Sequence, residues 1–374
     1  DLQALRLEES AASGRLEKAR LPLGNNPAVE SYVSRKDRPQ EDGGGAYTNY
    51  GFKISQEIEI AGQRGSRISA AQNELAAVRA GIADKERTLT ADVKDAFARA
   101  LALKKKEALA GQVLGLKEEF LGYAKIKYQA GDISALDVNL AEVELSKAKR
   151  ERLLSQREYQ ASLLALQSFF GAPPDLSLPL QGELPQNAPV MPDRRTVMNA
   201  AMSGRPDAQA ASLEMEKTKA LLMLAKKEAF PNLTLSGFYD RDELRNVVGV
   251  GLSIPFPLFD RKQAEKKEAL ARREGARIKA DGLKQAIERE VEQAVNDLTA
   301  AREELTIFNR EIIVKSGENL NLLNLAFKEG KVSFFEVRLA QKETMDVQFA
   351  YIDAQIRTQL AINALEKITG GALK

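Results

Sequence analysis

The stretch Tyr128-Gln-Ala-Gly-Asp-Ile-Ser-Ala-Leu-Asp-Val138 reappears later in the chain as Phe327-Lys-Glu-Gly-Lys-Val-Ser-Phe-Phe-Glu-Val337. An aromatic residue, Gly, Ser, an acidic residue and Val hold the same places in both copies. Similarity at one fixed shift, here roughly 200 residues, indicates repeated structural units. The chain is therefore predicted to contain a first repeat at 1–170, a linker at 171–205 and a second repeat at 206–370. Two further pairs of stretches match at this shift: Asp1-Leu-Gln-Ala with Asp207-Ala-Gln-Ala, and 55–64 with 253–262.

Each copy of this turn is predicted to join two long helices. Residues 64–128 contain no Pro and keep helical spacing, and at 1.5 Å per residue a helix of about 60 residues is on the order of 90 Å long. Gly131 ends this helix and a returning helix extends to about 170, so 64–170 forms a helical hairpin. The second repeat is expected to form the same hairpin at 261–368, with its first helix reaching Lys328. Shorter helices are expected at 2–20, 194–202 and 206–228, and the first has Leu5, Leu7, Ala11, Leu16 and Ala19 as candidate packing positions.

The long helices carry a coiled-coil pattern. Apolar residues spaced alternately by three and four positions form a heptad pattern, which predicts a left-handed supercoil. The small residues in it allow helices to approach closely. In the second repeat the pattern comprises Val291, Ala294, Leu298, Ala301, Leu305, Phe308 and Ile312; in the first, Val93, Ala96, Ala100 and Leu103, followed by Val138, Ala141, Leu145 and Ala148.

Two segments, at about 28–60 and 231–257, alternate with the period of β-hairpins instead. Polar loops are expected near 35–45 and 240–246. The last strand places large apolar side chains on one face and tiny ones on the other. The first face has Val248, Val250, Leu252 and Ile254, and the second has Gly249, Gly251 and Ser253. Each of the three earlier strands also places a set of residues on one face: Val29 and Val33 in the first strand, Tyr50, Phe52 and Ile54 in the second, and Leu233, Leu235, Gly237 and Tyr239 in the third.

This alternation is typical of a barrel strand with lipid on one side and water on the other. Strands in hydrocarbon must close into a barrel, because open edges leave backbone groups without hydrogen bonds. Four strands are too few to enclose a channel, so the hairpins would be shared between several chains. The alternative is a small water-exposed sheet that caps a helical stalk.

The composition excludes several classes of function. The chain has no Cys and no His, which excludes disulfides, zinc sites of the usual kind and Cys or His catalysis. The net charge is +2 and basic runs such as Lys104-Lys-Lys106 lie beside acidic residues, which argues against nucleic-acid binding. Gly43-Gly-Gly45 lacks the Lys of a phosphate loop. The sequence therefore predicts no enzyme, cofactor or metal site. Asp1 lies within an amphipathic pattern, so we expect the true N-terminus to precede it, and any targeting signal or lipid-bearing Cys would belong to that preceding part.

With two matching turns, two hairpins and a central linker, the chain resembles the outer membrane factor family, the TolC-like efflux channels of Gram-negative bacteria. The motifs that carry the resemblance are Tyr/Phe-x-x-Gly-x-x-Ser-x-x-(Asp/Glu)-Val-x-x-Ala at 128–141 and 327–340, the Pro-led strands, and Ser55-Gln-Glu-Ile-Glu-Ile-Ala-Gly-Gln-Arg64. The last stretch resembles the branch that serves heavy-metal efflux pumps of the RND type. The resemblance covers essentially all of 1–370.

The resemblance implies a homotrimer in which each protomer gives four strands to a twelve-stranded β-barrel in outer-membrane lipid. The helices would form a periplasmic α-barrel, with 171–205 as its equatorial belt and the loops at 35–49 and 240–246 outside the cell. The turns would form periplasmic tips that dock an adaptor protein, which couples the channel to an inner-membrane pump. The tip residues implied in docking are Gly131, Ser134, Asp137, Gly330 and Ser333.

Glu336 matches the position where the family often has an Asp in the closed constriction. A three-fold ring of carboxylates favours cations. Leu339 stands where a second acidic residue can occur, and Phe334 and Phe335 suggest an apolar narrowing instead. Local chemistry gives these turns a structural role as well: Gly131 and Gly330 permit positive φ, and Ser134 and Ser333 cap the helices that follow, with Asp137 and Glu336 completing capping boxes.

The leading hypothesis is a passive efflux conduit that performs no chemistry and opens when the tip helices splay apart. A type I protein-secretion conduit and a coiled-coil scaffold without a pore are the alternatives. A scaffold would purify without detergent. The exported substrate is not readable from the residues.

Overall fold

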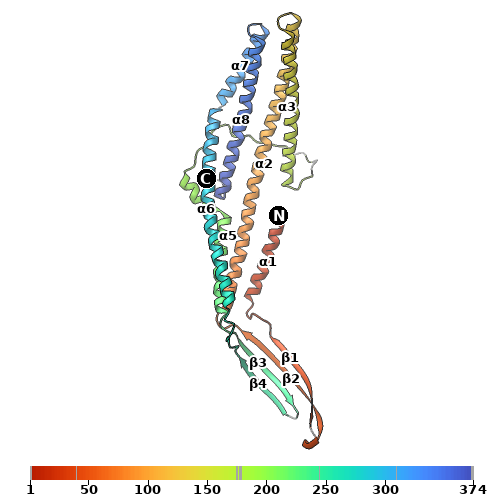
Figure 1. The fold of residues 1–374 in the computed structure, drawn as a ribbon, viewed down its shortest axis with the longest axis vertical. Helices are drawn as coiled ribbons and strands as arrows, with labels where there is room; N and C mark the ends of the chain where they lie inside the picture. Colours follow the sequence, from red (N-terminus) through yellow and green to blue (C-terminus); the bar gives the residue numbers. More distant parts are fainter. Residues whose placement is uncertain are drawn as a thin grey trace. The chain divides into compact units, whose positions relative to one another are not determined.

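The computed structural model describes residues 2–38, 40–173, 176, 179–243, 245–308 and 310–371. The chain forms two compact units, Asp1–Lys85 with Pro206–Gln285, and Glu86–Arg205 with Ala286–Lys374, so each unit takes residues from both sequence repeats. Figure 1 labels the elements. Their order is α1 (Leu2–Arg20), β1 (Ala28–Arg38), η1 (Gln40–Asp42), β2 (Gly45–Ile58), α2 (Gln63–Gln129), α3 (Ala135–Ser168), α4 (Arg194–Gly204), α5 (Pro206–Lys227), β3 (Leu233–Asp242), β4 (Arg245–Ser253), α6 (Gln263–Ile307), α7 (Arg310–Lys328) and α8 (Phe334–Thr369).

The predicted architecture, mainly helical with four strands, is confirmed. The expectation of one unbroken helix from 261 to Lys328 is wrong. The helix stops at Ile307 and restarts at Arg310, whereas α2 is continuous over 67 residues. The heptad pattern holds up to this break: Val291, Ala294, Leu298, Ala301 and Leu305 are all buried, but Ile312 beyond the break is exposed.

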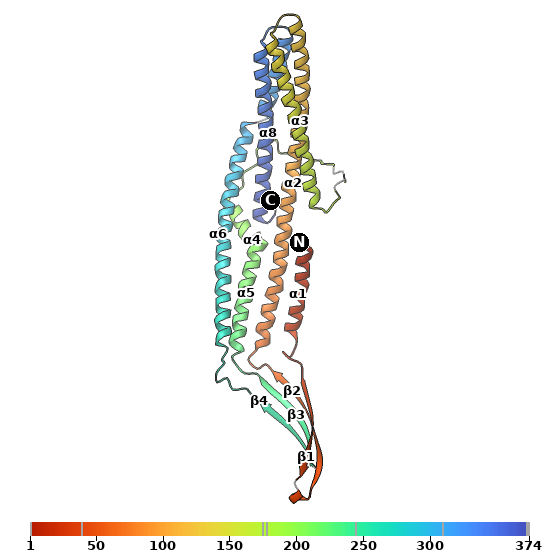
Figure 2. The ribbon, with the colours of Figure 1, turned by 45° about the vertical axis from the view of Figure 1, so that its right-hand side comes forward.

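The first unit contains one antiparallel sheet in the order β1-β2-β3-β4 (Figure 2). Directly paired residues share a face, and the register places Ile54 opposite Val29 and Gly237, and Val250 opposite Gly237. The predicted apolar face therefore runs unbroken across all four strands. Its large side chains are exposed, except for the half-buried Tyr239, and Val250 reaches 87%. The face comprises Val29, Val33, Tyr50, Phe52, Ile54, Leu235, Tyr239, Val248, Val250 and Leu252.

The opposite face of the sheet is polar or tightly packed. Tyr32 donates a hydrogen bond to Asp240 Oδ1 (3.0 Å) across the sheet. A Cβ at Gly249 would lie 2.4 Å from the Phe238 ring, so only Gly fits beneath that ring. The predicted loops at 35–45 and 240–246 are too long: β1 continues to Arg38 and β2 begins at Gly45, while β3 reaches Asp242 and β4 starts at Arg245.

Small residues bring the helices of the first unit together. Ala12, Leu16 and Ala19 of α1 pack against Ala71 and Leu75 of α2. Leu222 and Ala225 of α5 pack against Ala269 of α6 in the same manner. Two of the candidate packing positions on α1 are wrong: Leu7 is 74% exposed, and Ala11 is also exposed. Helix α1 turns Ala12 rather than Ala11 toward its neighbour.

The second unit has a larger core, in which the linker takes part. Leu180 and Leu184 from the linker pack with residues of α2, α3 and α8. Lys104 donates from Nζ to the carbonyl of Leu180 (3.0 Å), and Gln355 Nε2 donates to that of Pro185 (3.0 Å). These bonds fasten an otherwise irregular segment to the helices. The short linker helix expected at 194–202 is α4, which Asp193 caps.

Candidate functional site at the helical tips

The turns α2–α3 and α7–α8 lie at the same end of the second unit (Figure 1). Gly131 has φ +84° and Gly330 has φ +75°, as the sequence predicted. Both turns close through the same pair of backbone hydrogen bonds, the Schellman arrangement that satisfies carbonyls at a helix C-terminus. The bonds are Gly131 N to Tyr128 O (3.0 Å) and Asp132 N to Lys127 O (2.9 Å), and in the second turn Gly330 N to Phe327 O (3.0 Å) and Lys331 N to Ala326 O (2.8 Å).

A complete capping box starts the returning helix in each turn, as predicted. Ser134 donates from its backbone N (3.0 Å) and from Oγ (2.8 Å) to Asp137 Oδ2, and Oγ accepts from Asp137 N (3.3 Å). Ser333 donates to Glu336 Oε2 from N and Oγ, both at 2.7 Å, and accepts from Glu336 N (3.3 Å). Asp thus replaces Glu in the box without loss of any bond.

Glu336 combines this capping role with a surface position. Hydrogen bonds from the backbone and then from the side chain of Ser333 lower the pKa of its carboxyl group below the ordinary value. The carboxylate is therefore ionised at neutral pH. Its structural role is established by these bonds, and a role in permeation is compatible with them.

An aromatic cluster joins the two tips. The Phe334 ring stacks on Phe120 of α2 at 4.8 Å between centroids and meets Phe327 of α7 edge-on at 6.3 Å. Phe334 is only 7% exposed as a result. The expectation that Phe334 narrows a pore is therefore corrected: its side chain fills the core between the two helical hairpins.

The neighbouring residues of α8 point outward. Phe335 is 60% exposed and Leu339 is 46% exposed, so both present apolar surface. They lie on the same side of α8 because residues four positions apart are neighbours on a helix. The Arg338 guanidinium lies 5.5 Å from the Phe335 ring centroid, within the range of a cation–π contact. The structure brings Phe335, Glu336 and Leu339 onto the accessible surface of one helix end.

Sequence reasoning missed Lys117, which lies buried among the tip helices. Its side chain is 5% exposed, and Nζ donates to Gln341 Oε1 at 3.0 Å and lies 3.8 Å from a Glu144 carboxylate oxygen. Desolvation lowers the pKa of Lys117. The spacing of Lys117 within α2 gives no signal, because a basic residue in a charged helix is normally on the surface.

The described residues contain no group of three or more acidic side chains that could hold a metal ion. None of the helices in the described part of the chain is long and apolar enough to cross a membrane.

The sequence profile of the outer membrane efflux proteins matches residues 1–172 and 197–371. The chain belongs to the outer membrane efflux protein family. The two matched segments agree with the internal repeat. Members of this TolC-like family are channels rather than enzymes: this protein is the outer-membrane channel component of a tripartite efflux system, with a periplasmic helical extension.

Individual relatives support this assignment for the efflux protein. The cobalt-zinc-cadmium resistance protein CzcC of Cupriavidus metallidurans is 24% identical over 84% of this chain and 75% of its own length. The outer membrane protein OprJ of Pseudomonas aeruginosa is 25% identical over 98% of this chain and 80% of its own length. The crystal structure of the outer membrane protein VceC of Vibrio cholerae shares the fold, with a TM-score of 0.79 at 18% identity over 99% of this chain and 93% of that one.

Proposed function

We propose that the protein is a homotrimeric, cation-favouring conduit for divalent heavy-metal ions, closed at its helical tips. Three protomers would bring twelve strands together, with the exposed apolar face of each sheet toward lipid. The trimer would receive its cargo from an RND-type inner-membrane pump through a periplasmic adaptor. The protein itself would supply no energy.

The proposed cation preference rests on the position and charge of Glu336. Its carboxylate accepts hydrogen bonds from Ser333 at the start of α8, which lower its pKa, and it lies on the tip surface. A three-fold axis beside this position would create a ring of three negative charges, which attracts cations and repels anions. Phe335 and Leu339 flank it on the same helix end and would narrow the passage with apolar surface.

The surface around the turns supports docking of an adaptor. Ile126, Tyr128 and Leu136 are large apolar residues that stay exposed at the α2–α3 tip. In the proposed complex these exposed apolar side chains would be contact points for the adaptor. The rigid turn at Gly131 would present these side chains in a fixed geometry.

Heavy-metal cargo is supported by the similarity to CzcC, whose name states cobalt, zinc and cadmium resistance. The 374 residues contain no Cys and no His. Thiolate and imidazole are the ligands that bind such ions most tightly. A wall without them would let metal cations pass without trapping them.

Single-channel recordings of the detergent-purified trimer in planar bilayers test the gate. We expect small, cation-selective currents, and Glu336→Ala should increase the conductance and lower the cation-to-anion permeability ratio. Asp137→Ala is the matched control, because it removes the same capping acid from the other tip. Equal effects of the two substitutions would contradict a special role for Glu336 in permeation.

Growth assays test the cargo separately. The chain would be expressed, together with its adaptor and pump, in a strain that lacks its own metal-efflux channel. Restored growth on cobalt, zinc or cadmium is the expected result. Restored tolerance to organic compounds with no gain on metals would contradict the metal assignment and leave the channel function intact.

A further inference from the structure

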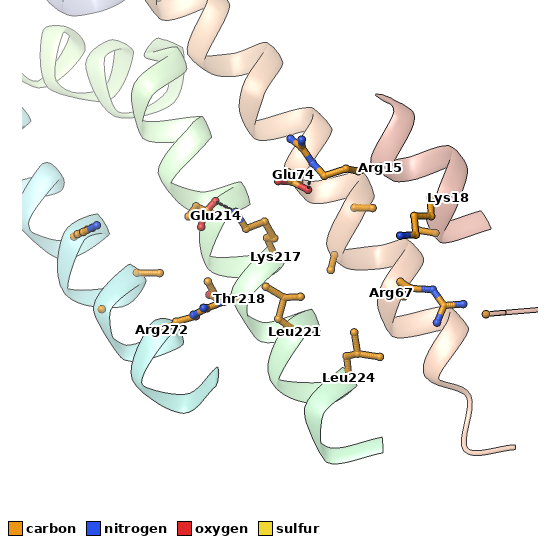
Figure 3. A pocket seen from close by; sticks show the side chains of 17 residues that line it. Arg15, Lys18, Arg67, Glu74, Glu214, Lys217, Thr218, Leu221, Leu224 and Arg272 are labelled. Carbon is orange, nitrogen blue, oxygen red and sulfur yellow. Dashed lines mark ion pairs between the residues drawn. The ribbon is translucent and has the colours of Figure 1, made fainter. Parts of the chain in front are cut away.

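A large cavity lies within the first unit, between helices α1, α2, α5 and α6 (Figure 3). Its volume is about 790 Å³, within the range of roughly 300–1,000 Å³ that is typical of small-molecule sites. It is separate from the helical tips, whose residues all belong to the second unit. The proposed cation conduit makes no use of the cavity.

The charges around this cavity are mostly positive. Six basic side chains line it against two acidic ones, Glu74 and Glu214. Glu74 pairs with Arg15 (3.2 Å), and Glu214 pairs with Lys217 (2.8 Å), as the dashed lines in Figure 3 mark. Two more basic side chains pair with acids outside the lining, Arg67 with Glu59 and Arg272 with Glu268. Lys18 and Lys279 form no ion pair among the described residues, so the lining keeps uncompensated positive charge.

Arg67 adds a second sign of an anion site. Its Nη1 bonds to Glu59 Oε1, but its Nη2 is buried and has no hydrogen-bond partner among the described residues. A buried donor without a partner is costly, so an incoming oxygen atom would be stabilised there. Lys18 of α1 and Arg67 of α2 both line this cavity.

The remaining wall of the cavity is apolar. Leu221 and Leu224 are half-buried and project from α5 toward α2 (Figure 3). Ala70 and Ala71 of α2 face the same space. An ion alone would leave this wall in contact with water, whereas a chain or ring of carbon atoms would cover it.

We infer that this cavity binds an anionic amphiphile, with its head group at Lys18 and Arg67 and its apolar part against Leu221 and Leu224. Lys279 adds positive potential from α6. A lipid of the outer membrane and an exported amphiphile share this chemistry.

Native mass spectrometry of the trimer in a non-ionic detergent tests the chemistry with three probes. Dodecanoate carries both features, dodecyltrimethylammonium has the same tail with a positive head, and inorganic phosphate is an anion without a tail. We expect binding of dodecanoate alone. Equal binding of the cationic probe would overturn the charge argument, and equal binding of phosphate would overturn the apolar one.

Substitutions locate the site. Lys18→Gln with Lys279→Gln should weaken dodecanoate binding by about tenfold, a change of one power of ten in Kd. Leu224→Asn should weaken it through the apolar wall. Lys267→Gln with Lys284→Gln removes two exposed charges of α6 outside the lining and should leave binding unchanged. Unchanged binding in the first two variants, with trimers intact, would overturn the proposal.

The protein as extracted from membranes distinguishes the two sources. A phospholipid that co-purifies with the wild type but not with the Lys18→Gln, Lys279→Gln variant would identify a membrane lipid. A trimer that is extracted empty and then takes up dodecanoate would identify an exported amphiphile. Both results support the site, and a wild type that is empty and takes up no dodecanoate contradicts it.

Discussion

The two tips of the second unit have the same turn in different surroundings. Both use a Gly with positive φ, a Schellman pair of hydrogen bonds and a capping box. After the capping Ser, however, the first tip has the small Ala135 and the second has Phe334. Ala135 is exposed, whereas Phe334 inserts between the two helical hairpins. The comparison shows that the local motif fixes the path of the backbone, and that the side chain after it decides which tip supplies the shared core.

Among the substitutions that test this comparison, removal of the inserted Phe334 ring should have the largest effect. Phe334→Ala should lower the stability of the second unit by about 3–5 kcal/mol, the usual loss for a buried Phe truncated to Ala. The midpoint of thermal unfolding, followed by circular dichroism in detergent, measures it. Phe335→Ala is the matched control on the exposed side and should change stability by no more than about 0.5 kcal/mol. Equal losses would mean that the aromatic cluster does not carry the contact between the tips.

Substitutions of the two turn glycines test the backbone turn that both tips share. Gly131→Ala and Gly330→Ala should each cost about 1–2 kcal/mol, because a Cβ disfavours the left-handed conformation. Gly122→Ala in α2 and Gly317→Ala in α7 are matched controls, since a Cβ there would meet nothing within 4 Å. Those controls should be stabilising by about 0.5–1 kcal/mol, because Ala is the better helix former. A loss at only one of the two turns would show that the turns are not equivalent.

The smallest effect concerns the acid in the second capping box. The pKa of Glu336 is lowered in the folded protein, so its contribution to stability is present above its ordinary pKa, about 4.3, and is lost as the pH falls through the lower folded value. Glu336→Gln should therefore flatten the decline of the unfolding midpoint at acidic pH. Ser333→Ala should flatten it in part, because one donor to the carboxylate is lost. A variant that declines with pH as steeply as the wild type would contradict this assignment.

Predictions from local sequence patterns were wrong where contacts with distant residues decide the structure. The polar ends of β1 and β2 were expected to be loops because residues 35–38 are charged, but cross-strand pairing to 45–48 extends the strands regardless of polarity. Helix α6 ends at Ile307 and α7 begins at Arg310, and the sequence 307–310 contains neither Gly nor Pro. No local sequence rule marks such a break, and the heptad pattern in the sequence continues past it.

The sequence by itself determined the repeat, the long helices, the two tip turns and the apolar face of the sheet. These features depend on residues within a few positions of one another, so spacing alone reveals them. Only the tertiary structure decided that Phe334 is buried while Phe335 is exposed, that Lys117 is enclosed opposite Gln341, 224 residues away, and that basic residues of four helices surround one cavity. Those outcomes depend on which distant helix faces which, and a helix with apolar and charged residues on several sides does not specify this locally.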